Sequence, residues 1–218
     1  MTADEMQRLV ESSLRRLFRK PPVGLLARLL GSSREYSYSI TDITPHASER
    51  EFKCSTVLSV TVEGYYLPIA LLPGDTSRGV FSITDGECYC LHPAYESTGL
   101  QKLFAAENAI AHMKPDTVAL LFCDAMHAAQ TKYRLLRSNA DFRKLSADEA
   151  VVGSVAPPVW SQSSADGSYT LDFSALAGSY RSWSLRAIAA HIAPDSNINL
   201  TERVLIDRVP TSDSHWRI

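Results

Sequence analysis

The side chains best suited to covalent chemistry in this chain lie together at Cys123, Asp124 and His127. They follow an apolar run at residues 117–123, which we interpret as a strand covered on both faces, with a helix as the alternative. A histidine that reaches a cysteine can take the thiol proton and leave a nucleophilic thiolate. The sequence therefore offers Cys123, Asp124 and His127 as a candidate catalytic site. The plainer interpretation is a buried cysteine that ends a strand, with a solvated histidine nearby.

A second group of reactive side chains, Cys88, Cys90 and His92, alternates along one strand-like segment. Thiolate and imidazole groups are good zinc ligands, and alternation places all three on one face. A strand rises about 3.3 Å per residue, so Cys88 and His92 would stand about 13 Å apart, too far to share one ion. We therefore predict no metal site and interpret the cysteines as small core residues. No dinucleotide-binding, P-loop, metalloprotease or nucleophile-elbow motif occurs, and we predict no cofactor.

Composition sets limits on the class of protein. The chain has 218 residues, of which 45% are hydrophobic, so it can bury a core of its own without metal or disulfide support. Its formal net charge of −2 argues against general nucleic-acid binding. There is no apolar run of about 18 residues and no signal-peptide layout. We therefore expect a cytoplasmic protein whose four cysteines are reduced.

The elements that must position these residues are mostly strands. Asp85-Gly86 is the strongest hairpin signal in the chain, because this pair favours the tight turn that joins two antiparallel strands. Apolar runs with strand-like composition or alternation lie at residues 36–43, 52–62, 65–72, 79–84, 87–92, 168–173, 182–192 and 198–209. Helical spacing of apolar residues recurs at residues 98–112 and 131–145. The last two strands are expected to form a long hairpin.

The N-terminal segment has a different character. Residues 4–20 have the spacing of an amphipathic helix, and residues 23–30 predict a short second helix. Residues 1–31 carry six basic and three acidic side chains. Our main interpretation is a helix that docks its apolar stripe on the protein's own sheet. The alternatives are a protein partner or self-association through residues 4–30, and peripheral contact with an anionic membrane.

Taken together, these patterns predict an α+β fold. The strand-like runs between residues 52 and 92 predict a meander of antiparallel strands. An antiparallel curved sheet, made of this meander and the long C-terminal hairpin, is packed by helices and preceded by a two-helix segment. We expect an N-terminal amphipathic helical segment at residues 1–31, a single α+β domain at residues 32–210 and a tail at residues 211–218. The leading functional hypothesis is a non-catalytic protein-interaction or ligand-binding protein, whose ligand-binding residues the sequence leaves unknown. The alternative is a small hydrolase- or transferase-type enzyme that uses the Cys/His site at Cys123, Asp124 and His127.

Overall fold

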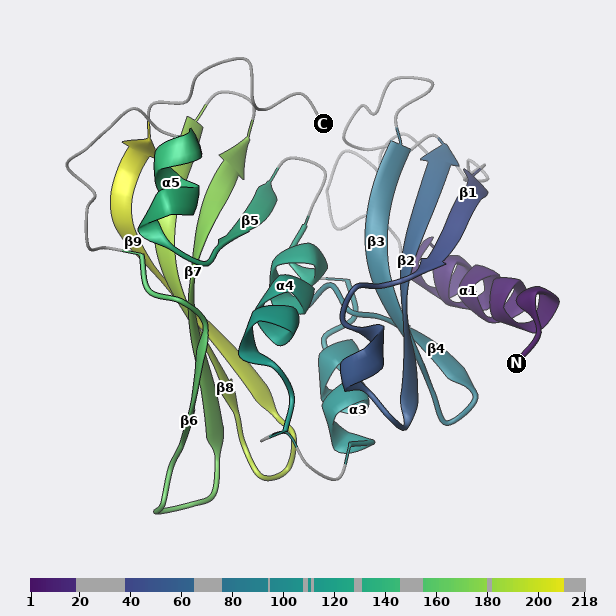
Figure 1. Ribbon diagram of the computed structural model, residues 1–218. Helices are drawn as coiled ribbons and strands as arrows, with labels where there is room; N and C mark the ends of the chain where they lie inside the picture. The colour runs from purple at the N-terminus through teal and green to yellow at the C-terminus, as the bar shows by residue number, and fades with distance from the viewer. Residues whose placement is uncertain are drawn as a thin grey trace, which may run out of the picture.

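The computed structural model describes residues 1–18, 38–64, 76–93, 95–107, 110, 112–127, 131–145, 155–179 and 182–209. Within these ranges the chain is an α+β protein with two antiparallel sheets, of four and five strands, and four α-helices. Two of the helices lie between the sheets (Figure 1). Mixed α+β architecture with antiparallel sheets is thus confirmed. The single continuous sheet that the sequence predicted is in fact two sheets, because a helical layer separates the meander from the C-terminal strands.

The first sheet combines the strand predicted at residues 36–43 with the described strands of the predicted meander. Its strands, in spatial order, are β1 (Tyr38–Pro45), β2 (Ser55–Gly64), β3 (Thr76–Thr84) and β4 (Glu87–Cys90). A short 3-10 helix, η1 (Glu49–Glu51), lies between β1 and β2. Asp85 and Gly86 have φ angles of 52° and 77°, which is the backbone that a tight hairpin turn requires. The β3–β4 hairpin is therefore confirmed where the sequence placed it, whereas the predicted strand at residues 65–72 lies outside the described residues.

Helix α1 (Ala3–Phe18) covers one face of the first sheet. Val10 and Leu14 are buried among apolar side chains of the sheet: Leu58, Val60, Phe81, Ile83, Cys88 and Cys90. This confirms that the helix docks on its own sheet and that the two cysteines are core residues. The predicted second helix at residues 23–30 lies outside the described residues. None of the described helices is both long and apolar enough to cross a lipid bilayer.

The second sheet contains the predicted C-terminal hairpin. Its strands are β5 (Lys132–Leu136), β6 (Val159–Gln162), β7 (Tyr169–Ser179), β8 (Ser182–Ile192) and β9 (Ile198–Val209). Their order is β5-β7-β8-β9, and β6 also pairs with β7. The described part of β9 has no strand on its outer side, so β9 forms an edge of the sheet (Figure 1).

One core joins the two sheets through α3 (Gly99–Ala105) and α4 (Pro115–Ala125). At its centre Phe122 of α4 stacks on Phe104 of α3 and on Phe173 of β7, with ring centroids 5.9 and 6.4 Å apart. Val57 and Val80 of the first sheet belong to the same buried cluster. They alternate with Leu58 and Phe81, which face α1, so the first sheet is covered on both faces.

The strand predicted at residues 117–123 is wrong, because this segment forms most of helix α4. The helix begins with Pro115, a residue whose fixed φ suits the first helical position. Between the two sheets it buries a broad apolar face: Val118, Ala119, Leu121, Phe122, Cys123 and Ala125. The acidic residues of its more exposed face, Asp116 and Asp124, lie just outside residues 117–123. Within that window only Thr117 and Leu120 are not fully buried, so the segment has the same continuous apolar character as a buried strand.

The helix predicted at residues 131–145 is correct only in its second half. Residues 132–136 form β5, which pairs with β7, and α5 (Asn139–Leu145) follows after a short break. Ser138 marks the break, because its Oγ accepts a hydrogen bond from the Asp141 N–H, as a helix-capping side chain does. The predicted helix at residues 98–112 is also shorter than expected, since α3 ends at Ala105.

Candidate functional site

The three predicted catalytic residues lie at the C-terminal end of α4, but they do not form a Cys–His pair. Cys123 is 0% exposed, and burial, followed by the Asp124 carboxylate, raises the pKa of its thiol. His127 donates its Nδ1–H to the main-chain carbonyl of Cys123, at 3.2 Å. A buried thiol with a raised pKa supplies little thiolate and gives a substrate no access. The described geometry therefore offers no support for nucleophilic catalysis here, and the enzyme hypothesis stays a prediction.

Asp124 instead binds a histidine that the sequence analysis did not select. The Ser48 N–H donates to His46 Nδ1 at 3.1 Å, so the other ring nitrogen, Nε2, donates to Asp124 Oδ2 at 3.0 Å. The Ser48 hydroxyl also lies 2.8 Å from Nδ1. This serine–histidine–aspartate chain has the connectivity of a catalytic triad, but Ser48 is 0% exposed. We interpret it as a structural link between the β1–β2 connection and α4.

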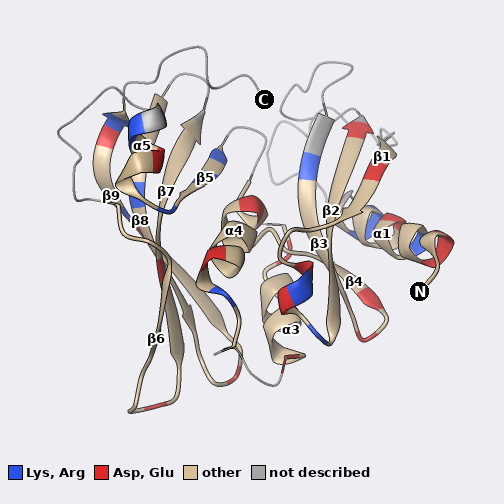
Figure 2. Cartoon of the chain, in the orientation of Figure 1, with Lys and Arg blue, Asp and Glu red and all other residues tan. Residues whose placement is uncertain are grey.

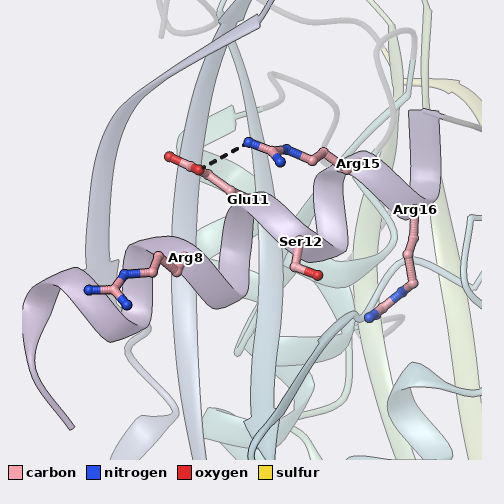
Figure 3. Close-up of a pocket in the computed structure, with 5 residues that line it drawn as sticks. All are labelled: Arg8, Glu11, Ser12, Arg15 and Arg16. Carbon is pink, nitrogen blue, oxygen red and sulfur yellow. Dashed lines mark ion pairs between the residues drawn. The ribbon is translucent and has the colours of Figure 1, made fainter.

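The outer face of α1 carries a basic hollow of about 410 Å³ lined by Arg8, Glu11, Ser12, Arg15 and Arg16 (Figure 3). Arg15 pairs with Glu11 at 3.6 Å. Arg16 donates to the Cys88 carbonyl and lies 3.5 Å from Glu96, which fastens the helix to the first sheet. Blue and red segments are interspersed along α1 in Figure 2. All the described residues that line this hollow thus belong to α1, and its arginine charges are partly neutralised by Glu11 and Glu96.

A groove with several walls lies where α3, the end of α4 and the second sheet meet. Its volume is about 340 Å³. It is lined by His92, Pro93, Ser97, Leu100, Gln101, Met126, Tyr133, Asn197, Ile198, Leu200 and Glu202. Polar and apolar side chains from both halves of the fold therefore converge on one concave surface, which is the usual composition of a ligand site.

Glu202 binds the polar side chains on one wall of the groove. Tyr133 donates its hydroxyl to Glu202 Oε1 at 3.0 Å, and Arg186 pairs with the other carboxylate oxygen. Arg186 in turn donates from Nε to Ser184 Oγ at 3.0 Å. Burial, and then the Glu202 carboxylate, raise the pKa of Tyr133 to about 12. The tyrosine is therefore a neutral hydroxyl near pH 7, and the Glu202 charge is balanced within the protein.

His92 forms another polar part of the groove. Its ring is half-buried and lies against Tyr95, with centroids 4.4 Å apart. Burial lowers the pKa of His92, and the nearby His127 lowers it further. Near pH 7 the groove therefore presents an uncharged imidazole, which can both donate and accept a hydrogen bond.

The chain matches no protein-family model, no curated protein and no solved structure. Of the groove residues, the sequence analysis singled out His92, but for zinc chemistry. Tyr133 and Glu202 lie 69 positions apart, and neither belongs to a motif, so no local signal identified them.

Proposed function

We propose that this protein is a non-catalytic binding protein and that its ligand occupies the groove between α3 and the second sheet. The observation that carries the proposal is the convergence of His92, Tyr133 and Glu202 beside an apolar floor that includes Leu100 and Leu200. The polar groups have their charges neutralised or suppressed, as the pKa shifts of His92 and Tyr133 indicate. Such a surface favours a ligand with an apolar body and a few hydrogen-bonding groups.

A protein partner that binds through residues 4–30 stays a prediction. In the described part of this region, α1 already packs its apolar face on the first sheet. A partner, or an anionic membrane surface, would therefore meet the outer face with Arg8 and Arg15. That face lacks the apolar area from which an amphipathic helix gains most of its binding free energy, so the groove is the better-supported site.

The proposal is tested by filling the groove. Leu200→Trp places a large side chain in it, and Val159→Trp makes the same kind of change on an exposed strand away from it. A library of small-molecule fragments is screened against the wild type and both variants by saturation-transfer NMR, after circular dichroism has verified folding. We expect fragments that bind the wild type and the Val159→Trp variant but not the Leu200→Trp variant. An identical set of fragments on all three proteins would contradict the proposal.

A further inference from the structure

The free edge of β9 lies beside the groove. Within the described residues, β8 is the strand that pairs with β9, and nothing pairs with its other side. The register with β8 is continuous over residues 198–204, and the irregularities occur only further along, opposite Leu185. Residues 198–204 therefore present a regular edge. Such an edge is a template for another strand, because its outward main-chain groups lack partners within the sheet.

The hydrogen-bond pattern shows which main-chain groups face outward. Next to the turn, the Ala193 N–H donates to the Asn197 carbonyl at 2.9 Å. Hydrogen-bonded pairs alternate along an antiparallel ladder. The main-chain N–H and C=O groups of Asn199 therefore face His191, those of Thr201 face Ala189, and the same holds at every second position beyond. The intervening residues of β9 direct their N–H and C=O groups away from β8: Ile198, Leu200, Glu202 and Val204.

The residues with outward main-chain groups are the ones that line the groove. The side chains of Ile198, Leu200 and Glu202 form one of its walls. Glu202 is an exposed residue although its side chain is only 26% exposed, so its main chain is accessible. Val204, further along the same edge, is 52% exposed. The edge and the groove are therefore one continuous surface.

We propose that this surface binds an extended peptide segment of another protein, which adds to β9 as a further strand. The proposal rests on the proposed function, because the groove takes every second side chain of the peptide. Those positions should be apolar, since Leu100, Met126 and Leu200 line the groove and the Glu202 charge is already paired with Arg186. The peptide side chains on the opposite face of the added strand lie near the exposed Arg203, so an acidic residue is favoured at the position beside it.

The shape of the groove selects a single strand over a second folded copy. Its volume of about 340 Å³ accommodates a few side chains. The β4–α3 connection and α3 also line the groove, through Pro93, Ser97 and Gln101. A whole sheet that approached this edge would meet these residues, whereas one extended segment fits between them and β9. Main-chain bonds then supply affinity and the groove supplies selectivity.

The test begins with a phage-displayed library of random peptides selected on the full chain. A selected peptide is then resynthesised with single N-methyl groups at successive positions, and its Kd is measured by calorimetry. Every second N–H faces β9, so we expect alternate positions to weaken binding by at least about tenfold and the positions between them to have little effect. The selected sequences should show apolar residues at alternate positions.

Two variants test the same contact from the protein side. Val204→Pro removes an outward N–H without breaking the ladder with β8, and Val204→Ala removes the side chain but keeps the N–H. We expect the proline variant to bind the peptide at least about tenfold more weakly than the alanine variant. If Val204→Pro does not fold, the N-methyl series decides the question by itself.

The outcomes separate this inference from the proposed function. If no peptide is selected, or if N-methylation shows no alternation, the added strand is refuted. If alternation is absent but Leu200→Trp still abolishes binding of fragments or peptide, the groove stands and only the strand is wrong. A concentration-dependent dimer in light scattering that Val204→Pro dissociates would show that a second copy occupies the edge, which also overturns the inference.

Discussion

At the scale of single residues, the two histidines near the groove are kept uncharged by their surroundings. Burial lowers the pKa of both His92 and His127. For His127, the Asp124 carboxylate opposes this effect but does not reverse it. Each ring is therefore a poorer proton acceptor in the folded protein than in the unfolded chain, where the pKa is about 6.5. Protonation consequently favours unfolding.

This sets the sign of a pH dependence. The contribution of the two histidines to stability is fully present above about pH 6.5 and is lost as the pH falls from there through their lower folded-state pKa values. We expect the free energy of unfolding in urea to decrease between about pH 7 and pH 5.5. The decrease should be smaller in the His92→Gln, His127→Gln double variant. The pKa of Asp166 is lowered to about 2 by hydrogen bonds from Ser163 and Ser168, so this residue changes the free energy of unfolding only at more acidic pH. An equal or steeper decrease in the double variant would contradict the assignment.

At the scale of the elements, the start of α3 depends on a close approach between two backbones. A Cβ atom at position 99 would stand 2.0 Å from the carbonyl oxygen of Cys90, at the end of β4. This separation is far inside van der Waals contact, and the obstructing atom belongs to the main chain. Gly99 is therefore required for α3 to pack directly against the first sheet.

Gly99→Ala tests this packing. Alanine favours an isolated helix over glycine by about 1 kcal/mol, so a helix governed by propensity alone would gain stability. We expect instead a loss of about 1–3 kcal/mol in the free energy of unfolding, because α3 must shift away from Cys90. Lys102→Ala, an exposed position on the same helix, serves as the control and should change stability by less than about 0.5 kcal/mol. A stabilised Gly99→Ala variant would show that the approach is not required.

At the scale of the whole molecule, the two sheets share one core and should unfold together. Phe122 lies at the centre of that core and contacts both Phe104 and Phe173. Buried residues from the first sheet, α3, α4 and the second sheet belong to the same cluster. The single domain at residues 32–210 stays a prediction, and this shared core gives it a measurable form.

We expect the wild type to unfold in one transition, in which tryptophan fluorescence and far-ultraviolet circular dichroism change together. Two of the three tryptophans, Trp160 and Trp183, belong to the second sheet, whereas circular dichroism reports on both sheets. Phe122→Ala should lower the free energy of unfolding by about 3–5 kcal/mol and shift both signals to the same extent. Separate transitions for the two signals would show that the sheets are independent units.

Local chemistry in the sequence determined the hairpins and the first helix. Asp85-Gly86 produces the β3–β4 turn, and the stripe that contains Val10 and Leu14 produces the docked face of α1. In each case the signal lies within neighbouring residues, because turn geometry and amphipathic spacing are local properties. The same reasoning correctly assigned Cys88 and Cys90 to the core.

Only the tertiary structure decided the identity of α4 and β5 and the composition of the groove. The segment at residues 117–123 is almost wholly apolar and fits either a strand or a helix, and the structure shows it as a helix whose broad buried face packs in the core shared by the two sheets. Residues 132–136 are a strand because β7, distant in the chain, supplies the hydrogen-bonding partner. Likewise, His46 meets Asp124 and Tyr133 meets Glu202 across separations of 78 and 69 positions. The folded chain brings these groups together through packing between distant segments, which a local pattern does not encode.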